Sequence, residues 1–270
     1  MKSAFPASLY LPRVGVGVSN EKTLSLFPGK IQKMDKIRIR GGTPLMGSVE
    51  ISGSKNASLP ILISALLSGG KCEFSNIPNL QDIRTTMKLL EILGCEAAIR
   101  GSKAEIVASE KSTTEAPYDL VRTMRASVVV LGPLLARYGR AKVSLPGGCA
   151  IGARPINFHL SALEKLGAQF EIEQGYVHAK GPSGAGVLVG NRVDLEFPSV
   201  GATENVVMAA TLARGESEIT NCAKEPEIID LAEALRAMGV RIDGAGTEVI
   251  RVQGTAGIPL KGCQYKVMAD

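Results

Sequence analysis

The stretch Leu89-Leu90-Glu91-Ile92-Leu93-Gly94 decides the fold, because two further versions of it occur along the chain. They are Ala162-Leu163-Glu164-Lys165-Leu166-Gly167 and Ala234-Leu235-Arg236-Ala237-Met238-Gly239. Apolar residues at helical spacing before a glycine are typical of a helix C-terminus, where glycine accepts the left-handed backbone that ends the helix. The three glycines lie 73 and 72 residues apart. The sequence therefore predicts three copies of one structural unit.

Each copy of this helix end is followed by two segments with alternating apolar residues, the pattern of β-strands. The first segments are 96–99, 169–172 and 241–243, and the second are 105–107, 176–178 and 249–252. An apolar helix and a strand precede each copy, within 61–74, 128–144 and 206–220. We therefore expect an α/β fold in which a helix–strand–helix–strand–strand unit occurs three times between about residues 55 and 262. Its sheets should lie outside and its apolar helices inside.

Two segments of different character precede the repeats. Residues 1–34 carry five lysines and arginines against one glutamate and show no helix or strand periodicity. We expect a disordered or artefactual tail, upstream of a natural start at Met34, with an organelle transit segment as the alternative. Alternating residues at 36–40 and 47–52, separated by a glycine-rich turn, predict a hairpin within residues 35–54. Residues 55–268 then form the three-repeat domain.

The composition argues against several classes of protein. The formal net charge is +5, most of it in the tail, and aromatic residues make up 4% with no tryptophan, so a nucleic-acid surface is not indicated. The five cysteines are widely spaced and the chain has two histidines, which gives no metal-ligand pattern. The apolar run 126–136 is too short to span a bilayer. We expect a cytoplasmic protein with reduced thiols and with no cofactor, metal, nucleic acid or membrane as partner.

The stretch Leu145-Pro146-Gly147-Gly148-Cys149-Ala150-Ile151-Gly152-Ala153-Arg154-Pro155 carries the strongest chemical signal. A thiol close to an arginine ionises more easily and becomes a better nucleophile or proton donor. The guanidinium of Arg154 offers a planar fork of donors for phosphate or carboxylate. The segment therefore points to chemistry on an anionic substrate, although a lone cysteine is more often a small buried apolar residue.

This stretch occurs together with three other motifs in one order. They are Ser52-Gly53-Ser54-Lys55-Asn56-Ala57, Thr123-Met124-Arg125-Ala126-Ser127 and Ser199-Val200-Gly201-Ala202-Thr203. From about Met34 to Asp270, the chain resembles the UDP-N-acetylglucosamine 1-carboxyvinyltransferase family of enolpyruvyl transferases. The resemblance implies an inside-out α/β barrel of repeated βαβαββ units. It also implies transfer of enolpyruvyl from phosphoenolpyruvate to the 3-hydroxyl of UDP-N-acetylglucosamine with release of phosphate, the first committed step of peptidoglycan precursor synthesis.

The resemblance also implies roles for individual residues. Cys149 is expected to be catalytic, as a proton donor to C3 of phosphoenolpyruvate that can also form a covalent adduct with it. Lys55 and Asn56 are expected to bind phosphoenolpyruvate. The residues expected to bind UDP-N-acetylglucosamine are Arg125, Arg154, Pro155, Ile156, Asn157, Phe158, Ser199, Val200 and Gly201. His159 matches a further polar position near the uridyl end.

Members of this family continue beyond the position of Asp270 into a second domain, which supplies an aspartate resembling the general base. We therefore expect a C-terminally truncated chain, and a hairpin that belongs to the mostly missing domain. A complementing C-terminal half is a possible partner, and the truncated chain is expected to be inactive alone. Two alternatives remain open: a non-catalytic UDP-sugar-binding fragment, and the sister transferase that uses shikimate 3-phosphate and lacks the thiol loop.

Overall fold

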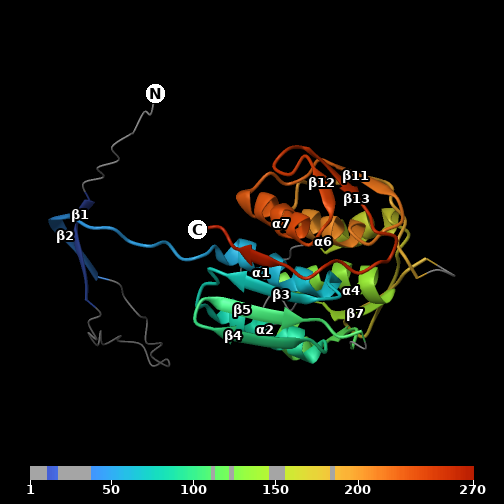
Figure 1. Ribbon diagram of the computed structural model, residues 1–270, viewed down its shortest axis with the longest axis horizontal. Coiled ribbons are helices and arrows are strands. Elements are labelled where there is room, and N and C mark those ends of the chain that lie inside the picture. Colours follow the sequence, from blue (N-terminus) through green and yellow to red (C-terminus); the bar gives the residue numbers. More distant parts are fainter. Residues whose placement is uncertain (1–10, 18–37, 111–112, 122–124, 146–155, 183–185) are drawn as a thin grey trace, which may run out of the picture. The chain divides into compact units, whose positions relative to one another are not determined.

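The computed structural model describes residues 11–17, 38–110, 113–121, 125–145, 156–182 and 186–270 (Figure 1). The chain divides into two compact units, Met1–Glu50 and Ile51–Asp270. The repeats and most of the motif residues belong to the second unit.

The described part of the first unit is a two-stranded antiparallel sheet of β1 (Leu11–Gly17) and β2 (Arg38–Leu45). Two expectations were wrong here. Residues 11–17 form a strand where a tail without regular structure was expected, and β2 pairs with this strand rather than with residues 47–52, none of which belongs to a strand. A strand with unpaired backbone groups pairs with whichever extended segment is available, and the alternation of side chains alone does not specify which one.

The second unit contains the three repeats in chain order. The first consists of α1 (Lys55–Ser64), the 3₁₀ helix η1 (Ala65–Leu67), β3 (Lys71–Ser75), α2 (Gln81–Ile92), β4 (Glu96–Arg100) and β5 (Lys103–Val107). The second consists of β6 (Glu115–Ala116), α3 (Tyr118–Val121), η2 (Arg125–Val130), α4 (Leu131–Tyr138), β7 (Arg140–Ser144), α5 (Asn157–Lys165), β8 (Gln169–Glu173) and β9 (Tyr176–Lys180). The third consists of β10 (Arg192–Asp194), α6 (Val200–Ala210), β11 (Glu216–Thr220), α7 (Pro226–Ala237), β12 (Arg241–Asp243) and β13 (Val249–Gln253), and β14 (Gln264–Lys266) follows it.

The repeat predicted from the three helix ends is confirmed. Gly94, Gly167 and Gly239 have φ values of 91°, 91° and 96°, the left-handed conformation that closes each helix. Each predicted pair of strands is present and forms an antiparallel ladder, as in β4 with β5.

Each repeat contributes to one four-stranded sheet. The strand orders are β14-β3-β5-β4, β6-β7-β9-β8 and β10-β11-β13-β12. In each sheet the first two strands named are parallel and the others antiparallel. In the second and third sheets the parallel edge strand is the first strand of its own repeat, whereas the first sheet takes β14 from the end of the chain. The strand that follows the last repeat therefore completes the sheet of the first repeat.

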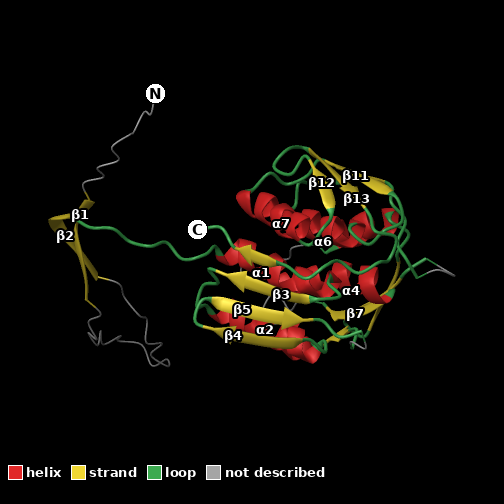
Figure 2. Ribbon diagram, viewed as in Figure 1, coloured by secondary structure: helices red, strands yellow, loops and turns green. Residues whose placement is uncertain are grey.

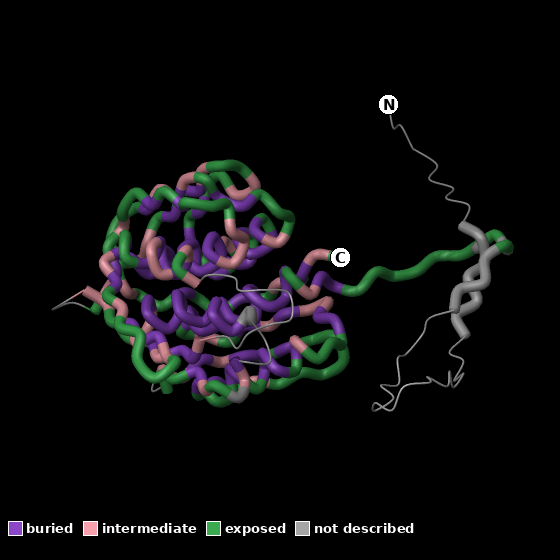
Figure 3. The backbone as a smooth tube through the Cα atoms, turned by 180° about the vertical axis from the view of Figure 1, so that it is seen from behind, coloured by how far each residue is buried: buried purple, intermediate pink, exposed green. Residues whose placement is uncertain are grey.

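The core lies between the sheets (Figure 2). Residues Ala57–Ser64 of α1, Leu131–Ala136 of α4 and Ala202–Ala210 of α6 are all buried. Strands such as β5 alternate between buried and exposed residues, so their sheets present one face to the helices and the other to solvent. Figure 3 shows the same distribution, with buried backbone at the centre and exposed backbone at the periphery. The expected arrangement of helices inside and sheets outside is confirmed.

Asp230 of α7 holds the returning strand in place. Its carboxylate accepts hydrogen bonds from the hydroxyl of Tyr265 at 2.6 Å and from the backbone N–H of Met268 at 3.1 Å. Beyond β14, the N–H of Ser54 donates a hydrogen bond to the carbonyl oxygen of Met268, and the N–H of Asp270 donates to that of Ser52. The segment before α1 and the last residues of the chain therefore run side by side.

Candidate functional site

A cavity of about 890 Å³ opens where helices α1, α5, α6 and α7 meet. Its described lining residues are Asn56, Leu59, Pro60, Ile63, Val128, Val129, Ile156, Phe158, His159, Phe197, Pro198, Ser199, Val200, Gly201, Glu204, Glu225 and Glu227. The cavity thus brings together residues from motifs that lie more than a hundred positions apart in the sequence. Its size is in the range of small-molecule sites.

The first turn of α6 supplies hydrogen-bond donors to this cavity. Ser199 is the N-cap, and its hydroxyl accepts from the N–H of Ala202 at 3.4 Å. The N–H groups of Val200 and Gly201 have no acceptor among the described residues. Because the first amides of a helix have no partner within it and carry the positive end of its dipole, this turn can hold an anion.

His159 packs against the same turn. A Cβ on Gly201 would lie 3.1 Å from Cε1 of His159, so glycine is what lets helix and ring approach this closely. The Nδ2 atom of Asn205 lies 3.0 Å from Nδ1 of His159. It also donates a hydrogen bond to the carbonyl oxygen of Val128 at 3.1 Å. The N–H of Gly132 donates to Oδ1 of Asn205 at 2.6 Å. Because burial lowers the pKa of His159 to about 4, the ring is neutral near pH 7 and accepts this hydrogen bond at Nδ1.

Two aromatic rings form one wall. Phe158 of α5 stacks on Phe197 with ring centroids 5.9 Å apart and an interplanar angle of 23°. Phe197 is exposed, with 56% of its surface accessible. A half-buried ring stacked on an exposed one, beside a row of amide donors, suits a ligand that has both a flat ring and an anionic group.

Another part of the cavity lining is acidic. Glu225 is the N-cap of α7 and Glu227 lies in its first turn. Glu204 of α6 is only 6% exposed, and burial holds its pKa well above the ordinary glutamate value, with a further increase from the negative charge of Glu227. No described residue that lines the cavity carries a lysine or arginine side chain. The described lining therefore contains neutral amide donors at the start of α6, and carboxyl groups from α7 and from Glu204 further along α6.

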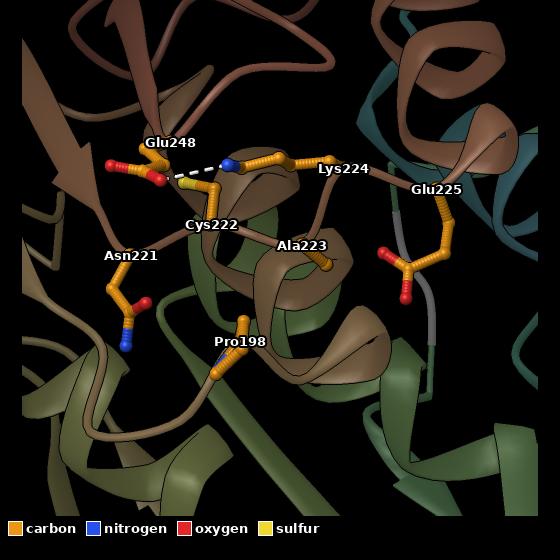
Figure 4. Close-up of a pocket in the computed structure, with 7 residues that line it drawn as sticks. All are labelled: Pro198, Asn221, Cys222, Ala223, Lys224, Glu225 and Glu248. Carbon is orange, nitrogen blue, oxygen red and sulfur yellow. Dashed lines mark hydrogen bonds and ion pairs between the residues drawn. The ribbon is translucent and has the colours of Figure 1, made fainter.

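The loop before α7 fixes the position of Glu225. The N–H of Ala223 donates to the hydroxyl of Thr203 on α6 at 3.1 Å. Figure 4 shows Lys224 turned toward Glu248, while Glu225 points away from that pair. Lys224 Nζ lies 2.8 Å from Glu248 Oε1, so this ammonium is paired within a smaller neighbouring cavity of about 520 Å³. Burial raises the pKa of the Cys222 thiol in that cavity to about 11, so this cysteine remains a thiol at neutral pH.

The sequence-predicted residues divide into three groups. Asn56, Ile156, Phe158, His159, Ser199, Val200 and Gly201 line the cavity. Lys55 and Asn157 do not line it: Lys55 is half exposed with its Nζ 3.4 Å from Asp82, and Asn157 is exposed at the start of α5. Cys149, Arg154 and Pro155 lie outside the described residues, as does the side chain of Arg125, whose backbone begins η2.

The start of α1 contributes a backbone hydrogen-bond acceptor to the cavity, which its sequence motif does not reveal. Pro60 lies inside this helix and also lines the cavity. Proline has no N–H, so the carbonyl of Asn56, four residues earlier, lacks its usual helical donor. Asn56 therefore offers a backbone acceptor as well as its side chain.

Sequence reasoning missed Phe197 and the three carboxyl groups. Phe197 directly precedes a quoted motif, but an aromatic residue before a helix has no specific meaning. Glu204 did give a signal: it is the one ionisable residue in the otherwise uncharged helix α6. Glu225 and Glu227 resemble any acidic first turn of a helix.

The described residues contain neither a membrane-spanning helix nor a metal-binding cluster. They contain no helix long and apolar enough to cross a membrane. They also contain no group of three or more histidine, cysteine, aspartate or glutamate side chains arranged to hold a metal ion.

Solved structures with the same arrangement identify the fold class. The enolpyruvyl transferase NikO from Streptomyces tendae matches with a TM-score of 0.72 and 20% identity, over 84% of this chain and 52% of that one. The EPSP synthase from Acinetobacter baumannii matches with a TM-score of 0.63 and 21% identity, over 83% of this chain and 50% of that one. The chain has the α/β fold of the enolpyruvyl transferases.

The family follows from sequence. Residues 39–270 match the family described as EPSP synthase (3-phosphoshikimate 1-carboxyvinyltransferase), and the chain belongs to it. Among curated relatives, the UDP-N-acetylglucosamine 1-carboxyvinyltransferase of Nitratidesulfovibrio vulgaris (strain Hildenborough) is 54% identical over 238 residues, 88% of this chain and 55% of the relative. That of Shewanella sediminis is 54% identical over 239 residues, 88% of this chain and 56% of the relative. The chain spans about half the length of these relatives.

Proposed function

We propose that the chain contributes the nucleotide-sugar-binding and thiol-bearing part of an enolpyruvyl transfer from phosphoenolpyruvate to UDP-N-acetylglucosamine, the first committed step of peptidoglycan precursor synthesis. The observation that carries this proposal is the cavity that joins Asn56, Phe158 and the first turn of α6. Identities of 54% to relatives named for this reaction support the same substrate. The setting would be the cytoplasm, where both substrates are available.

The cavity fits the parts of a UDP-sugar. The N–H groups of Val200 and Gly201, which have no acceptor among the described residues, would bind the diphosphate, since fixed amide donors at a helix N-terminus stabilise phosphate. The ring pair Phe158 and Phe197 would contact the uracil, together with the preceding segment that contains Arg154. Asn56 would then lie at the reacting end of the sugar.

The proposed reaction is an addition followed by an elimination. The 3-hydroxyl oxygen of the sugar bonds to C2 of phosphoenolpyruvate, C3 takes up a proton, and the hydroxyl proton leaves to a base. C3 then loses a proton, the bond between C2 and the phosphate oxygen breaks, and inorganic phosphate leaves with that electron pair. Cys149 would deliver the proton to C3. Lys55, Arg125 and Arg154 would supply the positive charge that a multiply charged anion requires.

The sister reaction on shikimate 3-phosphate remains the second candidate, because the matched family carries that description. It differs in its acceptor, a small phosphorylated ring rather than a nucleotide. A stacked aromatic pair beside a helix N-terminus favours the nucleotide.

Intact-mass measurement of the 270-residue protein tests the proposal. After exposure to phosphoenolpyruvate with UDP-N-acetylglucosamine, or to an epoxide phosphonate of the fosfomycin type, we expect a covalent adduct on Cys149. Cys149→Ala should abolish the adduct, whereas Cys222→Ala, a matched change at a buried thiol, should retain it. An adduct that persists in Cys149→Ala, or calorimetric binding of shikimate 3-phosphate with no binding of UDP-N-acetylglucosamine, would overturn the proposal.

A further inference from the structure

We propose that Glu204 helps to determine which ligand the cavity accepts: its buried carboxyl group hydrogen-bonds a neutral polar group of a sugar. This inference rests on the proposed function and assigns a residue to the sugar part of the ligand.

The first observation is that Glu204 is buried without a partner. It is 6% exposed and lines the cavity, and no described residue donates a hydrogen bond to its carboxyl group or forms an ion pair with it. Buried polar side chains in proteins are nearly always hydrogen-bonded, and one left alone is costly. Other polar groups of α6 are satisfied: Asn205 makes three contacts, and Thr203 bonds the carbonyl of Ser199 and the N–H of Ala223. Glu204 lines the cavity, so a ligand there can supply a hydrogen-bond partner for its carboxyl group.

The second observation concerns charge. Burial favours the neutral form of Glu204, and Glu227 favours it further. A neutral carboxyl group can both donate and accept a hydrogen bond. Hydroxyl groups and secondary amides, such as those of an N-acetylated sugar, offer the same combination.

The third observation is spacing. Glu204 follows Val200 by four residues and Gly201 by three on α6, so all three lie on one face of the helix. The backbone at Glu204 is thus about one helical turn, or about 5.4 Å along the helix axis, from the amides of Val200 and Gly201. A sugar bonded directly to a diphosphate at those amides falls within this distance. Helix α6 would thus bind the diphosphate with its first turn and the sugar with the next turn.

Calorimetric titration of the full chain with UDP-N-acetylglucosamine and with UDP separates the sugar contact from the diphosphate contact. Glu204→Met fills the same volume without a polar atom and should fold at least as well as the parent. We expect it to weaken binding of UDP-N-acetylglucosamine by about 10-fold and to leave binding of UDP within about 2-fold. Glu204→Gln keeps a donor and an acceptor in the same place and should retain both affinities within about 3-fold.

A matched control is Glu233→Gln, on the part of α7 where the carboxylate pairs with Arg236 outside the cavity. It should change neither affinity. Equal losses for both nucleotides in Glu204→Met would indicate a structural role and overturn the inference, as would unchanged affinities. If Glu204→Met does not fold, the glutamine variant decides: loss of its preference for the sugar nucleotide overturns the inference, and retention supports it. Failure of the parent protein to bind either nucleotide would overturn the proposed function as well.

Discussion

Helices α6 and α7 begin beside the same cavity but begin differently. The first turn of α6 holds Ser199, Val200 and Gly201, and two of its amides have no described acceptor. The first turn of α7 holds Glu225, Pro226 and Glu227, so its dipole is offset by its own carboxylates and one of its amides is replaced by proline. The difference is that α6 leaves backbone amides available at its N-terminus, whereas α7 offsets its own dipole with carboxylates.

The two helices are also anchored differently. The side chain of Asn205 connects α6 to His159 of α5, Val128 of η2 and Gly132 of α4. Asp230 connects α7 to the returning segment through Tyr265 and Met268. The first turn of α6 is thus held by the second repeat, while the first turn of α7 is held by the end of the chain.

The largest expected effect comes from breaking the anchor of α6. Asn205→Asp keeps the acceptor for Gly132 but loses the amide that contacts His159 and Val128, and it buries a carboxyl group. We expect the free energy of unfolding to fall by about 2–4 kcal/mol at pH 8, measured by chemical denaturation.

The pH dependence sharpens this prediction. In the parent, the pKa of His159 is lowered to about 4, so the unfolded state binds the proton first and stability falls as the pH drops from about 6.5 toward 4. A carboxylate at position 205 would raise the pKa of His159, so the variant should recover stability over part of this range. Asn191→Asp, at an exposed asparagine, serves as the control, and parallel pH profiles of the parent and Asn205→Asp would contradict the expectation.

Making α6 resemble α7 should abolish anion binding without harming the fold. Ser199→Asp places a carboxylate at the N-cap, where aspartate caps as well as serine. Because like charges about 5 Å apart cost about 3 kcal/mol at an effective dielectric constant of 20, we expect UDP to bind on the order of 100-fold more weakly.

The midpoint temperature of thermal unfolding of Ser199→Asp should be unchanged or slightly higher than that of the parent. Ser199→Ala is the matched control: it should lose about 1 kcal/mol of stability but keep its affinity for UDP within about 3-fold, because the backbone amides remain. Undiminished binding by Ser199→Asp would show that the anion lies elsewhere.

The smallest expected effect comes from making α7 resemble α6. In the double variant Glu225→Gln, Glu227→Gln, two negative charges leave the cavity, and we expect UDP to bind about 3- to 10-fold more tightly at low ionic strength. This gain should shrink above about 0.15 M salt, because exposed charges are screened. Helix α7 should lose about 0.5–1 kcal/mol of dipole stabilisation. An affinity independent of salt and equal to that of Glu233→Gln would count against the acidic wall.

Much of the fold could be predicted from local patterns. The glycines at 94, 167 and 239 end their helices as expected, since a helix C-terminus depends on residues within one turn of it. The partner of β2 could not be predicted this way, because alternation of side chains defines a strand and not its neighbour. Within the cavity, the segment Ser199–Gly201 was found through its motif, whereas Glu225 and Glu227 look like ordinary helix-start residues.

The sequence by itself determined the repeated unit, the buried helices and the order of the motifs, because periodicity and glycine conformation are set by neighbours in the chain. Only the tertiary structure decided that β14 returns to β3 and that the carboxyl groups of Glu204 and Glu227 line the same cavity as Asn56. These are contacts between residues far apart in sequence. They depend on how three repeats close around one core, and no single stretch of the chain encodes that closure.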